Sequence, residues 1–289
     1  MAIYNLGSIN IDHFYGVPHL PVPGETLAAD RYSFGLGGKG ANQSAAAAKA
    51  GARTVHIGAV GPEGAWIVER LRSWGVDTTH IAVLDTPTGH AVVTVDRSAE
   101  NAIVLFPGAN RALTAGQVEA ALAGAGPGDT LLLQNETTQQ AAAARIARAR
   151  GLRVVYSAAP FDADAVRAVL PDVTLLILNA VEAKQLCDAL GVSIEALDVP
   201  EILITRGAEG AEWRARGGAR AVTPAVRVQA VDTTGAGDTF AGYFAAGLDL
   251  GQSPEAALAW AAKAAALKVT RPGTADAIPT AAEVAAFQP

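Results

Sequence analysis

The segment Gly235-Ala236-Gly237-Asp238 joins a glycine turn to a carboxylate, where the sequence changes to apolar residues at helical spacing. Glycine lets the backbone approach a ligand closely, and the free N–H groups at the start of a helix favour an anion such as phosphate. Asp238 at such a place is often a helix cap. Its carboxylate can instead take the proton from a substrate hydroxyl whose oxygen attacks a phosphoryl group held on the N–H groups of this turn. The pattern predicts an anion site with Asp238 as a candidate general base.

Short apolar runs alternate with helical stretches along most of the chain, and these elements must position the turn. The apolar runs occupy residues 2–6, 54–60, 130–134, 153–157, 174–179 and 201–207. This alternation predicts an α/β fold with a mostly parallel central sheet and helices on both faces. We also expect a half-buried strand over Ala225 to Val231, where apolar and polar residues alternate before the turn. Ligands of such sheets bind at the carboxyl ends of strands, where we expect Glu136, Asn179, Thr205 and Asp232.

The sequence from Asp232 to Asp238, DTTGAGD, resembles the DTxGAGD signature of the ribokinase-like (PfkB) carbohydrate kinases. The resemblance extends over essentially the whole chain. It implies an ATP-dependent phosphotransferase for the primary hydroxyl of a small sugar, built as a single ribokinase-like α/β domain of residues 1–289. It also implies a small β lid, with lid strands inserted at about residues 12–34 and 88–107. An exposed sheet of this kind must be covered by substrate or by a second subunit, so we expect a homodimer through the lid.

Two further segments combine glycine, asparagine and charge. Residues 7–12 read GSINID after the first apolar run, and residues 37–42 read GGKGAN at the start of a helical stretch. Asn and Asp after a strand are ordinary turn residues, and together they also supply donors and acceptors for adjacent hydroxyls. GGKGAN resembles the sugar-binding signature of the ribose-phosphorylating members, which implies D-ribose as substrate and D-ribose 5-phosphate as product. The residues that the resemblance assigns to the sugar are Asn10, Asp12, Gly38, Lys39, Asn42, Glu136 and Asp238.

Asn179 and Glu182 have the spacing of an Asx helix start with an acidic first turn. They also fit the family's NxxE motif, which organises Mg²⁺ and the phosphates mainly through water. The segment from Thr205 to Gly210 resembles the loop around the nucleotide, with Arg206 as a candidate phosphate contact. The residues that the resemblance assigns to the nucleotide are Asn179, Thr205, Arg206, Gly207, Gly210 and Gly237.

The loop after the alanine-rich helical stretch 254–269 matches a monovalent-cation site of the family. A serine usually completes that site, and Ala277 stands in its place, so the sequence leaves a K⁺ requirement open. The ligands that the resemblance implies, mostly through backbone carbonyls, are Asp232, Thr234, Lys268, Arg271 and Gly273.

The amino-acid composition excludes some classes of partner and indicates the cellular compartment. The 289 residues carry a net charge of −6, which argues against nucleic acid or an acidic membrane surface as the main partner. The alanine-rich runs are interrupted by Lys49, Lys263 and Lys268, so we expect no membrane span. Cys187 is the single cysteine, which excludes an internal disulfide and fits a reducing cytoplasm. With no targeting segment visible, we expect a cytoplasmic enzyme that uses ATP, Mg²⁺ and a small sugar.

Three other functions stay open. The first is a kinase for another sugar or for a nucleoside, which needs a larger pocket beside the lid. The second is a sugar- or nucleotide-binding regulator without catalysis, against which the intact Asp238 argues because a pure binder needs no base. The third is an NAD-linked oxidoreductase, since Gly35, Gly37 and Gly40 formally match GxGxxG. That match is weak because the next strand is followed by Gly61-Pro62-Glu63 and not by the acidic residue that would be expected on a ribose.

Overall fold

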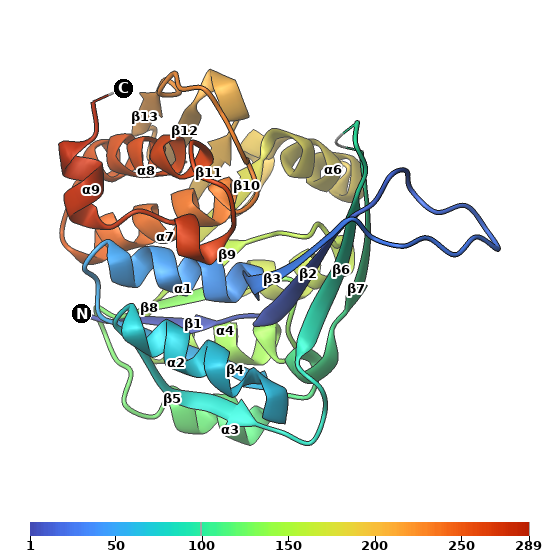
Figure 1. The fold of residues 1–289 in the computed structure, drawn as a ribbon. Helices are drawn as coiled ribbons and strands as arrows, with labels where there is room; N and C mark the ends of the chain where they lie inside the picture. Colours follow the sequence, from blue (N-terminus) through green and yellow to red (C-terminus); the bar gives the residue numbers. More distant parts are fainter. Residues whose placement is uncertain (99, 289) are drawn as a thin grey trace.

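The computed structural model describes residues 1–98 and 100–288. Within them, nine strands form a main sheet in the order β13-β12-β11-β10-β9-β8-β1-β4-β5 (Figure 1). The strands from β11 to β5 run parallel, and β12 and β13 extend one edge in antiparallel fashion. The strands are β1 Ile3–Leu6, β4 Thr54–Val60, β5 Val76–Val83, β8 Thr130–Gln134, β9 Arg153–Ser157, β10 Leu175–Asn179, β11 Glu201–Thr205, β12 Ala211–Ala215 and β13 Arg220–Thr223.

Helices cover both faces of the main sheet because its parallel strands are apolar on both sides (Figure 1). One apolar core lies between the sheet and α1, α2, α7, α8 and α9, and a second lies between the sheet and α3 to α6. The predicted α/β architecture is therefore confirmed. In the described part of the chain, no helix combines the length and apolar character that crossing a membrane requires. The helices are α1 Lys39–Lys49, α2 Ala65–Ser73, α3 Ala115–Ala121, α4 Gln140–Ala149, α5 Ala163–Val169, α6 Ala180–Leu190, α7 Ala236–Asp249, α8 Pro254–Val269 and α9 Ala281–Ala286.

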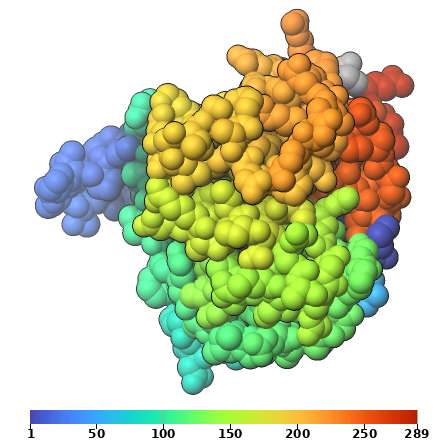
Figure 2. All heavy atoms as spheres, turned by 180° about the vertical axis from the view of Figure 1, so that it is seen from behind, coloured from blue at the N-terminus to red at the C-terminus, as the bar shows by residue number. Residues whose placement is uncertain are grey.

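A second, smaller sheet stands beyond the carboxyl ends of the parallel strands (Figure 1). Its order is β3-β2-β6-β7, with β2 Asn10–Gly16, β3 Arg31–Gly37, β6 Gly89–Val95 and β7 Asn101–Phe106. These strands fall at the two segments predicted for lid strands, and the connection between β2 and β3 projects from the body (Figures 1 and 2). Ala99, in the second predicted segment, lies outside the described residues. Every residue of β7 is exposed, so one edge of this small sheet is uncovered.

The predicted strand over Ala225 to Val231 is wrong. After β13 the chain takes an irregular course, and its side chains line a cavity beside α8. Its end is bonded to a helix terminus, since the N–H groups of Val231 and Asp232 donate to the carbonyl oxygen of Val269 at 2.7 and 3.1 Å. The apolar side chains of Val226 and Val228 therefore line this cavity and do not belong to a strand of the sheet. Strands β5, β12 and β13 were not predicted, because exposed residues interrupt the apolar pattern of β5 and β13, and the charged Glu212 and Arg214 interrupt that of β12.

Helices α1 and α7 lie against each other, and their contact brings the two glycine segments together. Gly242 marks the closest point, because a Cβ atom there would lie 2.5 Å from the Ala46 Cβ and 2.6 Å from the Gln43 carbonyl oxygen. Only a residue without a side chain allows this approach. The amino-terminal turn of α1 thereby reaches Asp238 on α7.

We expect the substitution Gly242→Ala to destabilise the protein by about 1–3 kcal/mol, because the added methyl group overpacks the contact between α1 and α7. The measurement is the thermal unfolding midpoint. Gly116→Ala in α3 is the matched control, since a Cβ at Gly116 meets nothing within 4 Å. An unfolding midpoint of Gly242→Ala equal to that of the wild type would contradict the close approach.

Candidate active site

Helix α7 begins directly after Gly235, whose φ of 72° is readily adopted by glycine. In the described structure, the N–H groups of Gly235, Gly237 and Asp238 have no hydrogen-bond acceptor. Free N–H groups at a helix start carry partial positive charge. The turn therefore has the free donors that an anion site needs, and its binding of an anion stays a prediction.

Two amides on α1 hold the Asp238 carboxylate. Asn42 Nδ2 donates to Asp238 Oδ2 at 2.9 Å, and Gln43 Nε2 donates to Asp238 Oδ1 at 3.0 Å. The carboxylate does not cap its own helix, because no side chain caps the start of α7. Each oxygen retains a lone pair, so Asp238 can still accept a hydrogen bond from a substrate hydroxyl.

The ammonium of Lys39 lies among three carboxylates that are distant in sequence. The negative charge of Asp238 raises the pKa of Lys39, burial opposes this, and Glu136 and Glu182 add to the increase. Glu136 also accepts from the backbone N–H of Lys39 at 3.1 Å and from the hydroxyl of Ser8. Lys39 therefore stays protonated and supplies the positive charge of the site.

The small sheet contributes Asn10 and Asp12 on β2. Burial and the nearby Glu136 raise the pKa of Asp12 to about 6. A side chain at Gly37, which pairs with Asn10 from the neighbouring strand β3, would collide with Asp12, since a Cβ there would lie 1.9 Å from Asp12 Oδ2. Asn10 Oδ1 accepts from Asn110 Nδ2 at 2.8 Å.

These contacts bring the predicted sugar residues to one side of the anion site, beside Gly38, which begins α1. Three side chains that hold them were not predicted. Ser8 and Asn110 bind Glu136 and Asn10, and Gln43 binds Asp238. Gln43 directly follows Asn42, the last residue of GGKGAN, so its place beside this motif was the sequence feature that could have identified it.

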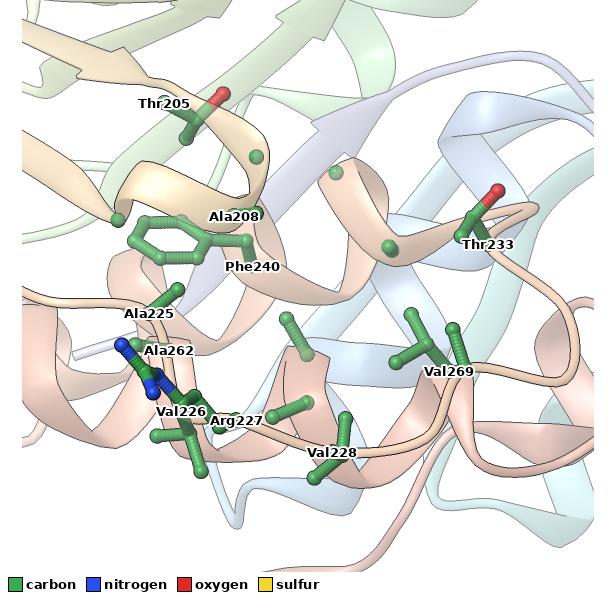
Figure 3. A pocket seen from close by; sticks show the side chains of 17 residues that line it. Thr205, Ala208, Ala225, Val226, Arg227, Val228, Thr233, Phe240, Ala262 and Val269 are labelled. Atoms are coloured by element: carbon green, nitrogen blue, oxygen red, sulfur yellow. The ribbon is translucent and has the colours of Figure 1, made fainter.

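A cavity of about 600 Å³ lies on the other side of the anion site (Figure 3). Its walls are mostly apolar and come from α7, α8, the loop after β11 and the irregular segment 225–230. Thr205 and Phe240 lie at one end and Thr233 lies at the other (Figure 3). Three predicted nucleotide residues line this cavity, namely Thr205, Gly207 and Gly210, and Gly237 lines it at the anion site.

The other predicted nucleotide residues have partners of their own. Arg206 Nη1 donates to Glu212 Oε2 at 2.9 Å, so its guanidinium is held in an ion pair. Asn179 and Glu182 cap the start of α6 reciprocally, with both hydrogen bonds at 2.8 Å. Burial raises the pKa of Glu182, and Asp238 and Lys39 lie near enough to act on it.

The loop predicted to bind a monovalent cation contains a cation already. Lys268 has no exposed surface, and its Nζ donates to the carbonyl oxygen of Asp232 at 3.0 Å. The carboxylate of Asp232 accepts from the N–H groups of Thr234 and Gly273, both at 2.9 Å. The carbonyl of Lys268 accepts from the N–H of Arg271 at 3.0 Å. A second cation beside this ammonium would be repelled, so these residues do not fit a K⁺ site.

A candidate general base at a helix start with free N–H groups, near a cluster of polar side chains and an apolar cavity, has the parts of a phosphotransferase. The chain belongs to the pfkB family of carbohydrate kinases, whose family model matches residues 3–281. It is 37% identical over 302 residues to the ribokinase of Haemophilus influenzae, with 98% of this chain and 96% of that protein covered.

Solved structures are similar over the same extent. The ribokinase of Cryptococcus neoformans in complex with ADP has a TM-score of 0.86 and 33% identity, and 99% of each chain is covered. The Arabidopsis thaliana ribokinase complexed with ribose and ATP has a TM-score of 0.86 and 29% identity, with 99% of this chain and 98% of that chain covered. The predicted family, fold and enzyme class are therefore confirmed.

We expect kcat/KM for the sugar to fall as the pH is lowered through about 6, because Asp12 gains a proton there. Above this pH the Asp12 carboxylate accepts hydrogen bonds from hydroxyls, and below it that capacity is reduced. The measurement is the pH profile of kcat/KM. Asp12→Asn is uncharged at every pH and should lose this limb of the profile. An unchanged limb in Asp12→Asn would assign the titration to another group.

Proposed function

We propose that this protein transfers the γ-phosphoryl group of ATP to the primary hydroxyl of D-ribose, which gives D-ribose 5-phosphate. The observation that carries the proposal is the position of Asp238, which is held by two amides beside free N–H groups, near the polar side chains of Lys39 and Glu136 and at the end of an apolar cavity. The similarity to ribokinases over nearly the whole chain supports ribose as the sugar.

In this proposal, Asp238 accepts the proton of the hydroxyl as its oxygen attacks the phosphoryl group. The N–H groups from Gly235 to Asp238 stabilise the negative charge of the transferring group. Asn42 Oδ1 is buried and has no partner within the described residues, so it is available to a sugar hydroxyl. The sugar is held by Asn10, Asp12, Gly38, Lys39, Asn42 and Glu136.

The adenine ring of ATP fits the apolar cavity, where Phe240 and Ala262 line the wall. The phosphates then extend past Thr205, Gly207 and Gly210 toward the anion site at Gly237. Arg206 can contact a phosphate only while it shares its guanidinium with Glu212. The apolar wall and the anion site together match the two parts of a nucleotide.

Mg²⁺ would be held near Asn179 and Glu182, mainly through water. No group of three or more His, Cys, Asp or Glu side chains that could hold a metal occurs among residues 1–98 and 100–288, so dedicated direct ligation has no support. One oxygen of Glu182 accepts from the N–H of Asn179, and the other is available to bound water. When bound, Mg²⁺ neutralises the charge that develops on the phosphates.

The small sheet would act as the lid of the sugar site, and two copies would form a homodimer through it. Large apolar side chains on this sheet are exposed, among them Tyr32, Phe34 and Phe106. An open sheet edge with exposed apolar side chains favours a covering partner. The compartment proposed for this dimer is the cytoplasm, in keeping with the single cysteine.

We expect ADP release from Mg·ATP to be at least about tenfold faster with D-ribose than with deoxyribose, fructose or adenosine, because unpaired polar groups penalise deoxyribose, which lacks a hydroxyl, and because fructose and adenosine need a larger pocket. A coupled assay across these acceptors is the measurement. Asp238→Asn is the control and should lower kcat by about 10²–10⁴. Preference for another sugar or nucleoside would overturn the substrate, and nucleotide binding without turnover would favour the non-catalytic regulator.

We expect turnover to change by less than about twofold when K⁺ is replaced by choline, because the Lys268 ammonium already supplies a positive charge beside Asp232. Lys268→Met should lower kcat, whereas Lys263→Met on the same helix is the matched control and should retain it. Strong activation of the wild type by K⁺ would contradict this expectation.

A further inference from the structure

A continuous chain of buried polar side chains leads from Asp238 into the main sheet. Its members have no exposed surface, and they come from α1, β1, β4 and β8. Hydrogen bonds connect them along the contact between α1 and the neighbouring strands β8, β1 and β4. In the order of these bonds, starting at Asp238, they are Gln43, Gln134, Asn5, Ser44 and His56.

In the half of this hydrogen-bonded chain next to Asp238, the donor and the acceptor of each hydrogen bond are fixed. A carboxylate only accepts hydrogen bonds, so Gln43 must present Nε2 to Asp238 Oδ1. Gln43 Oε1 then points inward and accepts from Gln134 Nε2 at 2.8 Å. Gln134 Nε2 also donates to Asn5 Oδ1 at 2.9 Å. The amide of Gln43 is therefore held at both of its ends.

Beyond Gln134 the hydrogen bonds are fixed as well, and each member donates away from Asp238. His56 Nε2 donates to the carbonyl oxygen of Gly7 at 3.1 Å, so Nδ1 accepts from the Ser44 hydroxyl at 2.8 Å. Burial lowers the pKa of His56 to about 4, which keeps the ring neutral with one N–H. Ser44 Oγ in turn accepts from Asn5 Nδ2 at 2.8 Å. No member of the chain can reverse its amide or tautomer without losing a bond.

Burying this hydrogen-bonded chain costs folding free energy that an apolar core would not cost. Gln134 Oε1 is buried and has no partner within the part of the chain that the structure describes. Such an acceptor has given up hydrogen bonds to water without replacement. Its neighbours Leu132 and Leu133 on β8 are apolar and fully buried. The amide at position 134 is therefore better explained by its hold on Gln43 than by stability.

We propose that Gln43, held by Gln134, is a positioning residue that fixes the plane of the Asp238 carboxylate for proton transfer. This inference rests on the proposed function of Asp238 as base. Asn42 and Gln43 bind different oxygens of Asp238, so together they prevent rotation of the carboxylate. With Asn42 alone, the carboxylate turns about that single bond. The lone pair that meets the substrate hydroxyl is then misplaced, and misplacement lowers the rate of transfer more than it lowers binding.

Two substitutions at position 43 test this role. Gln43→Met keeps the length and removes the donor, and we expect kcat to fall at least about tenfold while both KM values change less than about threefold. Gln43→Glu is nearly isosteric and places a second carboxyl against Asp238. The two carboxyls then share a proton, so the acid limb of kcat moves to higher pH by more than about one unit. A purely structural role of Gln43 would not move this limb.

Ser44→Ala is the matched control, because Ser44 follows Gln43 on α1, has the same burial and does not touch Asp238. It should lose thermal stability but keep kcat within about threefold and keep the pH profile. Wild-type kcat and pH profile in both Gln43 variants would overturn the inference. So would failure of both variants to fold while Ser44→Ala folds. If the wild type phosphorylates no sugar, the proposed function fails first, whatever the variants do.

Discussion

Two hydrogen bonds from α1 to the Asp238 carboxylate join the two halves of the site. They exist because Gly242 lets α7 lie close against α1, so the first turn of one helix reaches the first turn of the other. The turn proposed to bind the sugar stands at the start of α1, and the turn proposed to bind the phosphoryl group stands at the start of α7. If the helices moved apart, Asp238 would lose its orientation and the two turns would lose their spacing.

The electrostatics of the site follow from this arrangement. Three carboxylates that are separated by up to 102 residues in sequence, those of Glu136, Glu182 and Asp238, gather around one ammonium, that of Lys39. The N–H groups at the start of α7 add positive charge where a phosphoryl group would be transferred. Lys268 donates to the carbonyl oxygen of Asp232 and so holds the segment of chain that leads into the turn. Positive charge is therefore concentrated near the turn at which Asp238 stands.

Much of the fold could be predicted because parallel strands carry continuous apolar runs. The strands at β8 and β9 have the bounds that the runs at 130–134 and 153–157 predicted. The strand predicted over residues 225–231 was wrong because a segment that lines a cavity alternates apolar and polar residues as an edge strand does. The motifs located the turns and their polar residues, whose roles toward ligands stay predictions. The sequence did not reveal the partners of those residues. Gln43 binds Asp238, Arg206 binds Glu212 and Lys268 binds Asp232, and each contact depends on tertiary packing.

In the proposed reaction, Asp238, oriented by α1, receives the proton of the sugar hydroxyl that attacks the phosphate. A crystal structure of the protein with D-ribose, Mg²⁺ and a non-hydrolysable ATP analogue would test this role of Asp238. We expect the primary hydroxyl within about 3 Å of an Asp238 carboxylate oxygen, the γ-phosphate on the N–H groups after Gly235, and both amide hydrogen bonds from α1 intact. A ribose whose primary hydroxyl lies beyond the reach of Asp238, or a γ-phosphate bound away from this turn, would contradict it.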